Sequence, residues 1–187
     1  MPQAVTHILI PLILMALIRD FYLRESKGRH KRSFPLHYVL IAGLAGLLPD
    51  IDIAIFGIIN FLKAVPLLSI HRTFTHSIFF PLILLLLYVI FAVWKDFHIP
   101  ILRKHKLKVS IIFLMIFFGS FMHILLDFVL NWVISPLYPF YDITIGLNLI
   151  RYLPSHIQEI FIPSLDAILL FFWLIYLELK HKISDFI

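Results

Sequence analysis

Acidic and histidine side chains lie within or against the most apolar stretches of this chain. They occur in three motifs, which are Leu48-Pro49-Asp50-Ile51-Asp52, His71-Arg72-Thr73-Phe74-Thr75-His76-Ser77 and His123-Ile124-Leu125-Leu126-Asp127. An ionised aspartate at the centre of a membrane helix costs about 2.5–3.5 kcal/mol on insertion scales. Imidazole and carboxylate groups are ligands that zinc takes in proteins. The motifs therefore indicate a metal site at membrane depth.

The spacing of His123 and Asp127 suits two ligands of one metal. Residues four apart on an α-helix project from one face, one turn from each other. A buried, hydrogen-bonded His–Asp pair is the alternative, and this motif alone fits the two interpretations equally.

Pro49 lies in the middle of a predicted membrane helix. A proline there removes a helix hydrogen bond and kinks or breaks the helix. On an intact helix Asp50 and Asp52 would point about 200° apart, whereas a break at Pro49 would let both turn inward. Broken backbone at membrane depth is tolerated only where it is buried in protein or lines a wet cavity. The alternative is a helix end with Asp50 as its N-cap.

His71 and His76 are five residues apart, which is too far round for one face of a helix. We expect a loop that runs into a helix start, with Thr75 or Ser77 as its cap. Arg72 lies between the two histidines, and arginine binds phosphate oxygens well. For either histidine alone, a surface position beside the lipid headgroups is the favoured alternative.

Other ionisable residues carry weaker signals. His7, alone on an apolar face, is by itself more typical of a hydrogen-bonded core histidine than of a ligand. His156 and Glu159 are three residues apart and could serve one further metal, but they lie in a predicted loop, where exposed polar residues are normal. Asp166 closely follows Pro163, which predicts a place near a helix N-terminus and outside the site.

The composition excludes a soluble domain. The 187-residue chain is 61% hydrophobic and has a mean hydropathy of +0.96, which predicts a single membrane-embedded domain over residues 1–187. The absence of cysteine excludes disulfides and thiolate ligands. Residues 4–18 follow no basic segment and precede no small-residue cleavage site, so we expect a retained helix.

We expect an all-α, polytopic membrane protein with about five transmembrane helices. The predicted spans are residues 4–18, 36–62, 77–94, 109–134 and 160–179. Thirteen of the sixteen lysines and arginines then fall on one side, in residues 19–35, in residues 95–108 and in the C-terminal tail. The positive-inside rule places the N-terminus outside and the C-terminus inside the cell membrane. This topology, derived from lysine and arginine alone, gathers the acidic and histidine motifs toward the extracytoplasmic face.

The order of these motifs resembles the YdjM family of inner-membrane-associated metal-dependent hydrolases. The resemblance covers about residues 6–140, from Thr6-His7 through the three motifs to Ser135-Pro136-Leu137-Tyr138-Pro139-Phe140. Its most specific parts are His-Arg-x-x-Thr-His-Ser and Pro-Asp-x-Asp.

The family is distantly similar to zinc-dependent phospholipase C and P1-type nucleases, which implies a helical core like theirs. The resemblance implies metal ligands at His7, Asp50, His71, His76, His123 and Asp127. The later ligands of those enzymes are not matched, since His156 and Glu159 have the wrong spacing. The resemblance therefore implies one or two metal ions and not three.

We expect a membrane-bound enzyme that cleaves a phosphate ester of a lipid at the outer interface. Zinc suits the ligands, with manganese or iron as alternatives, and a bound metal lowers the pKa of water to about 7. Asp127 would bridge two metals, and Asp52 would orient the water, act as base or complete a coordination sphere. Arg72 would bind the substrate phosphate and stabilise developing charge. The expected partners are the lipid bilayer and a lipid phosphate, and no nucleic acid.

Two other functions fit the sequence. Intramembrane aspartates and histidines also mark ion pathways, so a transporter or proton relay is one alternative, although the chain shows no paired halves with matching broken helices. A regulatory or scaffold membrane protein is the other, with the basic residues 19–35 and 95–108 binding a cytoplasmic partner or anionic lipid.

Overall fold

The computed structural model describes residues 4–25, 34–62, 73–94, 99–130 and 133–182. Within these ranges the chain is helical and forms no β-strand, apart from one isolated bridge between Ile134 and Ile145. The α-helices are α1 (Ala4–Glu25), α2 (Leu36–Ala45), α3 (Ile51–Leu62), α4 (Phe79–Val93), α5 (Pro100–Lys104), α6 (Val109–Leu130) and α7 (Ser155–His181). Two 3₁₀ turns, η2 (Phe74–His76) and η3 (Leu149–Tyr152), precede α4 and α7. The all-α prediction is confirmed.

Three of these helices are long and apolar enough to cross a membrane. They are α1, α6 and α7. The helices α2, α3 and α4 are apolar but shorter, and the longest of them, α4, has 15 residues. A helix needs about 20 apolar residues to cross the hydrocarbon core unaided. The structure therefore supports a membrane protein, while the five spans and their orientation stay predictions.

The predicted second span is interrupted at its proline. Helix α2 ends at Ala45 and α3 begins at Ile51, with buried Pro49 in the turn between them. The predicted break is confirmed. Asp50 immediately precedes α3. It therefore lies at a helix start, as expected for an N-cap residue, and it is also turned inward, as expected from a break at Pro49.

Small residues let the helices approach closely around α2. A Cβ on Gly119 of α6 would lie 2.3 Å from the carbonyl oxygen of Ala42, and one on Gly46 would lie 1.9 Å from the carbonyl oxygen of His7. Such small residues are typical of tightly packed membrane helices. The N-terminal part of α1, the end of α2 and the middle of α6 meet for this reason.

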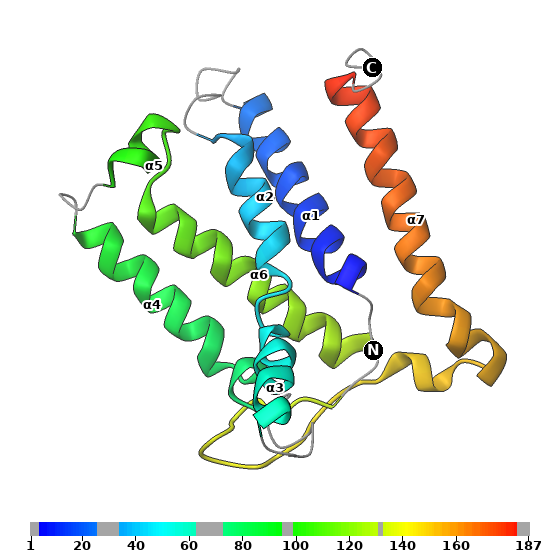
Figure 1. Ribbon diagram of the computed structural model, residues 1–187. Coiled ribbons are helices and arrows are strands. Elements are labelled where there is room, and N and C mark those ends of the chain that lie inside the picture. Colours follow the sequence, from blue (N-terminus) through cyan, green and yellow to red (C-terminus); the bar gives the residue numbers. More distant parts are fainter. Residues whose placement is uncertain (1–3, 26–33, 63–72, 95–98, 131–132, 183–187) are drawn as a thin grey trace.

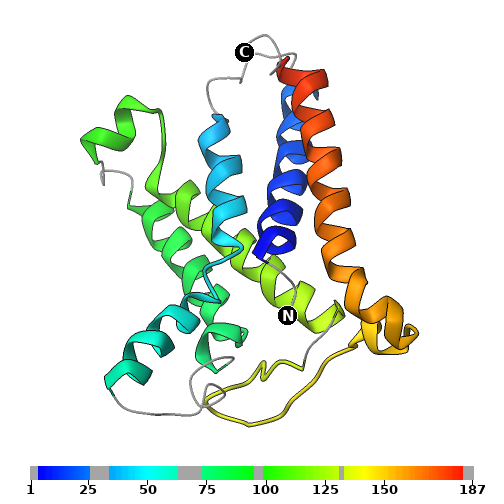
Figure 2. The same ribbon diagram turned by 45° about the vertical axis from the view of Figure 1, so that its right-hand side comes forward.

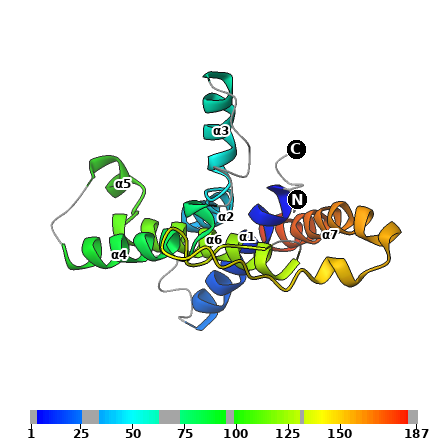
Figure 3. The ribbon, with the colours of Figure 1, turned by 90° about the horizontal axis from the view of Figure 1, so that it is seen from below.

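The helix ends fall into two groups (Figure 1). The end of α1, the start of α2, α5 and the end of α7 lie at the upper end of the molecule, while α3, η2 and residues 133–154 lie at the lower end. The segments predicted to face the cytoplasm are thus next to one end, and the acidic and histidine motifs lie toward the other. In the rotated views, α3 projects away from the remaining helices (Figures 2 and 3).

Candidate metal centre

Two histidines and two aspartates from three parts of the chain bring donor atoms together. His123 and Asp127 come from α6, His76 ends η2, and Asp50 precedes α3. Nε2 of His76 lies 3.3 Å from Nε2 of His123, and Oδ1 of Asp50 lies 3.3 Å and 3.5 Å from these two atoms. Oδ2 of Asp127 lies 3.6 Å from each of them. The donor atoms of Asp50, His76 and His123 lie within 4.8 Å of one another, as do those of His7, His123 and Asp127, so each group of three could hold a metal ion. Separations near about 3.4 Å suit zinc, whose bonds to these donors are about 2.0–2.1 Å long.

His7 extends the cluster on the other side of Asp127. Its ring stacks on His123 with centroids 3.9 Å apart, and its Nε2 lies 3.5 Å from Oδ1 of Asp127. Nδ1 of His7 and Oδ1 of Asp127 are buried with no hydrogen-bond partner among the described residues. Buried polar atoms normally have such a partner. Asp127 thus offers Oδ1 toward His7 and Oδ2 toward His76 and His123.

The backbone selects which nitrogen of His123 faces the cluster. Nδ1 of His123 lies 2.7 Å from the carbonyl oxygen of Gly46. Because a carbonyl only accepts hydrogen bonds, Nδ1 carries the proton and donates it. The lone pair is thereby left on Nε2, which is the atom that faces Asp50 and His76.

Asp52 and Thr75 have a similar relation to His76. Nδ1 of His76 lies 3.6 Å from Oδ2 of Asp52 and 3.1 Å from the hydroxyl oxygen of Thr75, whose hydroxyl donates to Oδ2 of Asp52 over 2.7 Å. Metal-binding histidines commonly donate their second ring N–H to a carboxylate, which fixes the ring orientation. Asp52 is thus on the side of His76 opposite to Nε2, and its predicted catalytic role stays a prediction.

The charges around His76 favour its protonated form when no metal is bound. Burial lowers the pKa of His76, but the interactions with Asp50 and Asp52 outweigh burial and raise the pKa above its usual value. A metal ion that binds Nε2 must displace this proton.

The cluster is closed on all sides but one. The side chains of His76 and His123 are 0% exposed and that of Asp127 is 3% exposed, whereas Asp50 is 27% exposed. Of these four side chains, that of Asp50 is therefore the most accessible.

Two of the predicted site residues cannot be compared with this cluster. His71 and Arg72 lie outside the described residues. His156 and Glu159 are exposed in the first turns of α7 and do not lie in the predicted loop.

The prediction for Asp166 is wrong. Helix α7 begins at Ser155 and accommodates Pro163 in its interior, so Asp166 lies well inside the helix and not near its start. Its side chain is buried, and the hydroxyl of Thr6 donates a hydrogen bond to its Oδ1. Its Oδ2 has no hydrogen-bond partner among the residues that the structure describes.

The dipeptide Thr-His occurs twice in the sequence beside these buried aspartates and could have pointed to their hydrogen-bond partners. Thr6-His7 and Thr75-His76 each place a threonine immediately before a cluster histidine, and each threonine hydroxyl donates to a buried aspartate. The sequence predicted Thr75 only as a helix cap. The Gly46 carbonyl has no comparable signal, because a backbone group is the same at every residue.

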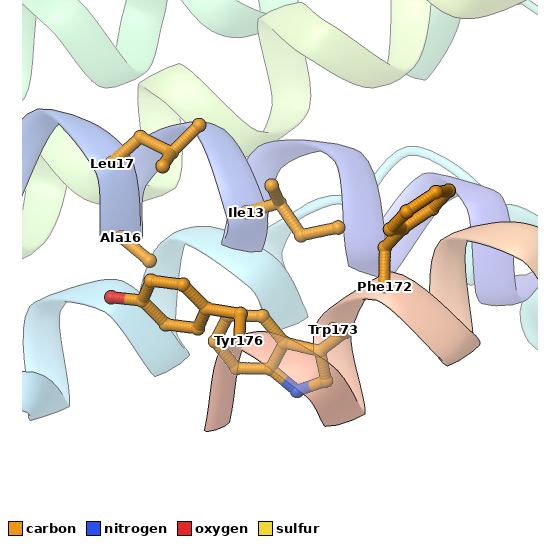
Figure 4. Close-up of a pocket in the computed structure, with 6 residues that line it drawn as sticks. All are labelled: Ile13, Ala16, Leu17, Phe172, Trp173 and Tyr176. Atoms are coloured by element: carbon orange, nitrogen blue, oxygen red, sulfur yellow. The ribbon is translucent and has the colours of Figure 1, made fainter. Parts of the chain in front are cut away.

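A separate apolar pocket lies between α1 and α7 (Figure 4). Its lining residues are Ile13, Ala16, Leu17, Phe172, Trp173 and Tyr176. None of these residues belongs to the donor set, so the pocket is distinct from the candidate metal centre.

Comparison with protein families identifies what the chain is related to. Residues 1–182 match the family described as YdjM inner membrane protein. Searches of the curated proteins and of the solved structures found no match. The resemblance to YdjM proteins is thereby confirmed over nearly the whole chain, together with placement in the inner membrane, whereas a likeness to phospholipase C or P1 nuclease finds no support. This chain belongs to the YdjM inner membrane protein family.

Proposed function

We propose that this protein is a metal-dependent hydrolase of the inner membrane that cleaves a phosphate ester of a lipid. The observation that carries the proposal is the pair of overlapping donor groups, Asp50–His76–His123 and His7–His123–Asp127, in each of which the donor atoms lie within 4.8 Å of one another. Among the residues that the structure describes, Asp50 and Asp127 pair only with histidines, and a bound metal ion would neutralise their carboxylates.

The donor types indicate which ion would bind. Two imidazoles and two carboxylates suit zinc, with manganese or iron as alternatives. His7 and the second oxygen of Asp127 would contribute to a second ion. When bound, such an ion would activate a water molecule and polarise a phosphoryl oxygen.

The residues around the donors have distinct proposed roles. The Gly46 carbonyl and Asp52 hold the rings of His123 and His76 so that both Nε2 atoms face inward. Asp50 forms the accessible edge at which substrate would enter. Arg72 is proposed to bind the phosphate oxygens, on the ground that it lies in the same sequence motif as His76 and that arginine favours bidentate contacts to phosphate.

A lipid substrate follows from the surroundings of the site. The cluster lies among helices of which α1 and α6 are long and apolar enough to cross a membrane. A lipid could bring its headgroup to Asp50 while its acyl chains stay in the bilayer. We place the site toward the extracytoplasmic face, in accordance with the distribution of lysine and arginine.

Metal content tests the first part of this proposal. Protein purified under metal-replete conditions should contain one or two equivalents of zinc, manganese or iron by elemental analysis, and His123→Ala and Asp127→Ala should lose most of it. His156→Ala and Asp142→Ala are matched controls, since both residues are exposed, and should retain the metal. Wild-type protein without metal would overturn the proposal.

Hydrolysis tests the second part. Phosphatidic acid, phospholipids and a polyprenyl phosphate, presented in mixed micelles, should include one that is cleaved by the wild type. Chelator and His123→Ala should abolish release of phosphate or of the phosphorylated headgroup. Metal-loaded protein that cleaves no lipid phosphate would contradict hydrolase activity and would leave metal binding intact as a separate result.

One observation favours a proton relay as a second candidate. The two Nε2 atoms of His76 and His123, 3.3 Å apart, are close enough to share a proton. Proton flux into proteoliposomes that persists in chelator and is lost in Asp50→Asn would support this function in place of hydrolysis.

A further inference from the structure

Helix α3 stands apart from the other helices. It has 12 residues and projects from one face of the layer that α1, α4, α6 and α7 form in the view from below (Figure 3). Its side chains are correspondingly open to the surroundings, with Ile58 67% and Phe61 90% exposed.

The exposed surface of α3 is apolar on every side. Beyond Asp52, residues 53–62 contain no charged side chain and only one polar side chain, that of Asn60. The exposed large apolar residues are Ile51, Ile53, Ile55, Ile58 and Phe61, and only the side of Asp52, Phe56 and Ile59 is less exposed. A helix that is hydrophobic all round is buried in protein or in a membrane.

The length of α3 excludes a span. Twelve residues extend about 18 Å, whereas the hydrocarbon core is about 30 Å thick. The helix also begins directly after Asp50, at the level of the metal centre, and leads away from the bundle and not along it (Figure 2).

We propose that α3 is embedded in the hydrocarbon of one leaflet and lies roughly parallel to the membrane plane, where lipid acyl chains surround it. A second protein or a second copy of this chain would cover one face of a helix. Helix α3 is exposed on every side except that of Asp52, Phe56 and Ile59, and acyl chains would cover so wide a surface. Membership of an inner-membrane family supplies the bilayer. This inference concerns only α3 and does not depend on the proposed metal or hydrolysis.

The lack of native cysteine permits a direct test. Single cysteines would replace Ala54, Ile58 and Phe61, which share one face of α3 and are all exposed. Each variant would carry a nitroxide spin label in proteoliposomes, and power saturation with oxygen and with a water-soluble nickel chelate would give its depth. We expect strong oxygen access, weak nickel access and similar depths at the three positions.

Helix α7 provides matched control positions with the same spacing. Ile168, Phe172 and Ile175 are exposed on this long helix. The first and last of these three positions are about 10 Å apart along the helix axis. Their depths should differ by most of that distance. A depth range in α3 as large as that in α7 would overturn the proposal. Nickel access exceeding oxygen access would do so too, as would dipolar broadening in singly labelled protein, which would identify a second copy as the partner.

Discussion

Nδ1 of His123 lies 2.7 Å from the carbonyl oxygen of Gly46. This contact orients His123, one proposed ligand, and it comes from a backbone segment that lies beside His7, another proposed ligand. Gly46 also touches the backbone of His7, because a Cβ at this position would lie 1.9 Å from the carbonyl oxygen of His7. Residue 46 therefore has two effects. Its lack of a side chain lets His7 approach, and its carbonyl oxygen orients His123. Together they bring the His7 and His123 rings into a stack.

Gly46→Ala should therefore damage both stability and metal binding. The added methyl group would push α1 away from the end of α2, and overpacking of this kind costs about 1–3 kcal/mol or more. We expect a lower melting temperature in detergent and a reduced metal content. Gly57→Ala is the matched control, since its Cβ would meet nothing within 4 Å and alanine stabilises a helix by about 0.5–1 kcal/mol relative to glycine. Wild-type melting and metal content in Gly46→Ala would refute the role of this glycine.

Asp52→Asn and Thr75→Val should weaken metal binding without removing a donor atom. Both substitutions disturb the hold on Nδ1 of His76, and loss of such an outer partner typically lowers metal affinity about 10–100-fold. Chelator competition would measure this change. Thr75→Ser keeps the hydroxyl and should bind like the wild type. If Asp52→Asn could not be loaded at any metal concentration, Asp52 would itself be a ligand.

Much of the candidate site was predictable because its residues are linked by local geometry. The four-residue spacing of His123 and Asp127 places both on one face of α6, and the proline after Leu48 led to the expected break before Asp50. Longer-range relations were not predictable in this way. Nothing in the sequence fixes the 3.3 Å distance between His76 and His123, because it depends on how η2 packs against α6.

The prolines show why the helix boundaries were harder to predict. The turn at Pro49 separates two helices, but Pro11 and Pro163 lie inside α1 and α7. Proline always removes one helix hydrogen bond, and the packing around it decides whether the helix continues. A start of a helix near Asp166 was expected from Pro163 alone, without the contact of Thr6 that holds Asp166 in the helix interior.

The Thr6–Asp166 hydrogen bond should couple the stabilities of α1 and α7. Thr6→Val would leave Oδ1 of Asp166 without this donor, and an unsatisfied buried group costs about 1–3 kcal/mol. The double variant Thr6→Val/Asp166→Leu removes both polar partners and should recover much of that loss. Thermal unfolding of the two single variants and the double variant would give the coupling, with exposed Thr144→Val as the neutral control. Additive effects would show that the two side chains do not stabilise each other.

Site-directed labelling should establish which side of the membrane the metal centre faces. His105 directly follows α5 and Tyr141 belongs to residues 133–154, two segments at opposite ends of the molecule (Figure 1). Both side chains are exposed, and neither substitution alters a lysine or arginine. The excess of basic residues around His105 predicts a cytoplasmic position for it. In intact cells a membrane-impermeant maleimide should therefore react with Tyr141→Cys, and with His105→Cys only after permeabilisation.

Because the chain has no other cysteine, unmodified protein serves as the blank in this experiment. Residues 105 and 141 belong to segments at opposite ends of the molecule (Figure 1). If both cysteines were labelled from the same side of the membrane, the chain between them would not cross the membrane an odd number of times, which would contradict the proposed topology. Reversed labelling would keep the fold but turn η2, α3 and Asp50 toward the cytoplasm. A lipid substrate would then have to come from the inner leaflet, and the extracytoplasmic site proposed from the positive-inside rule would be wrong.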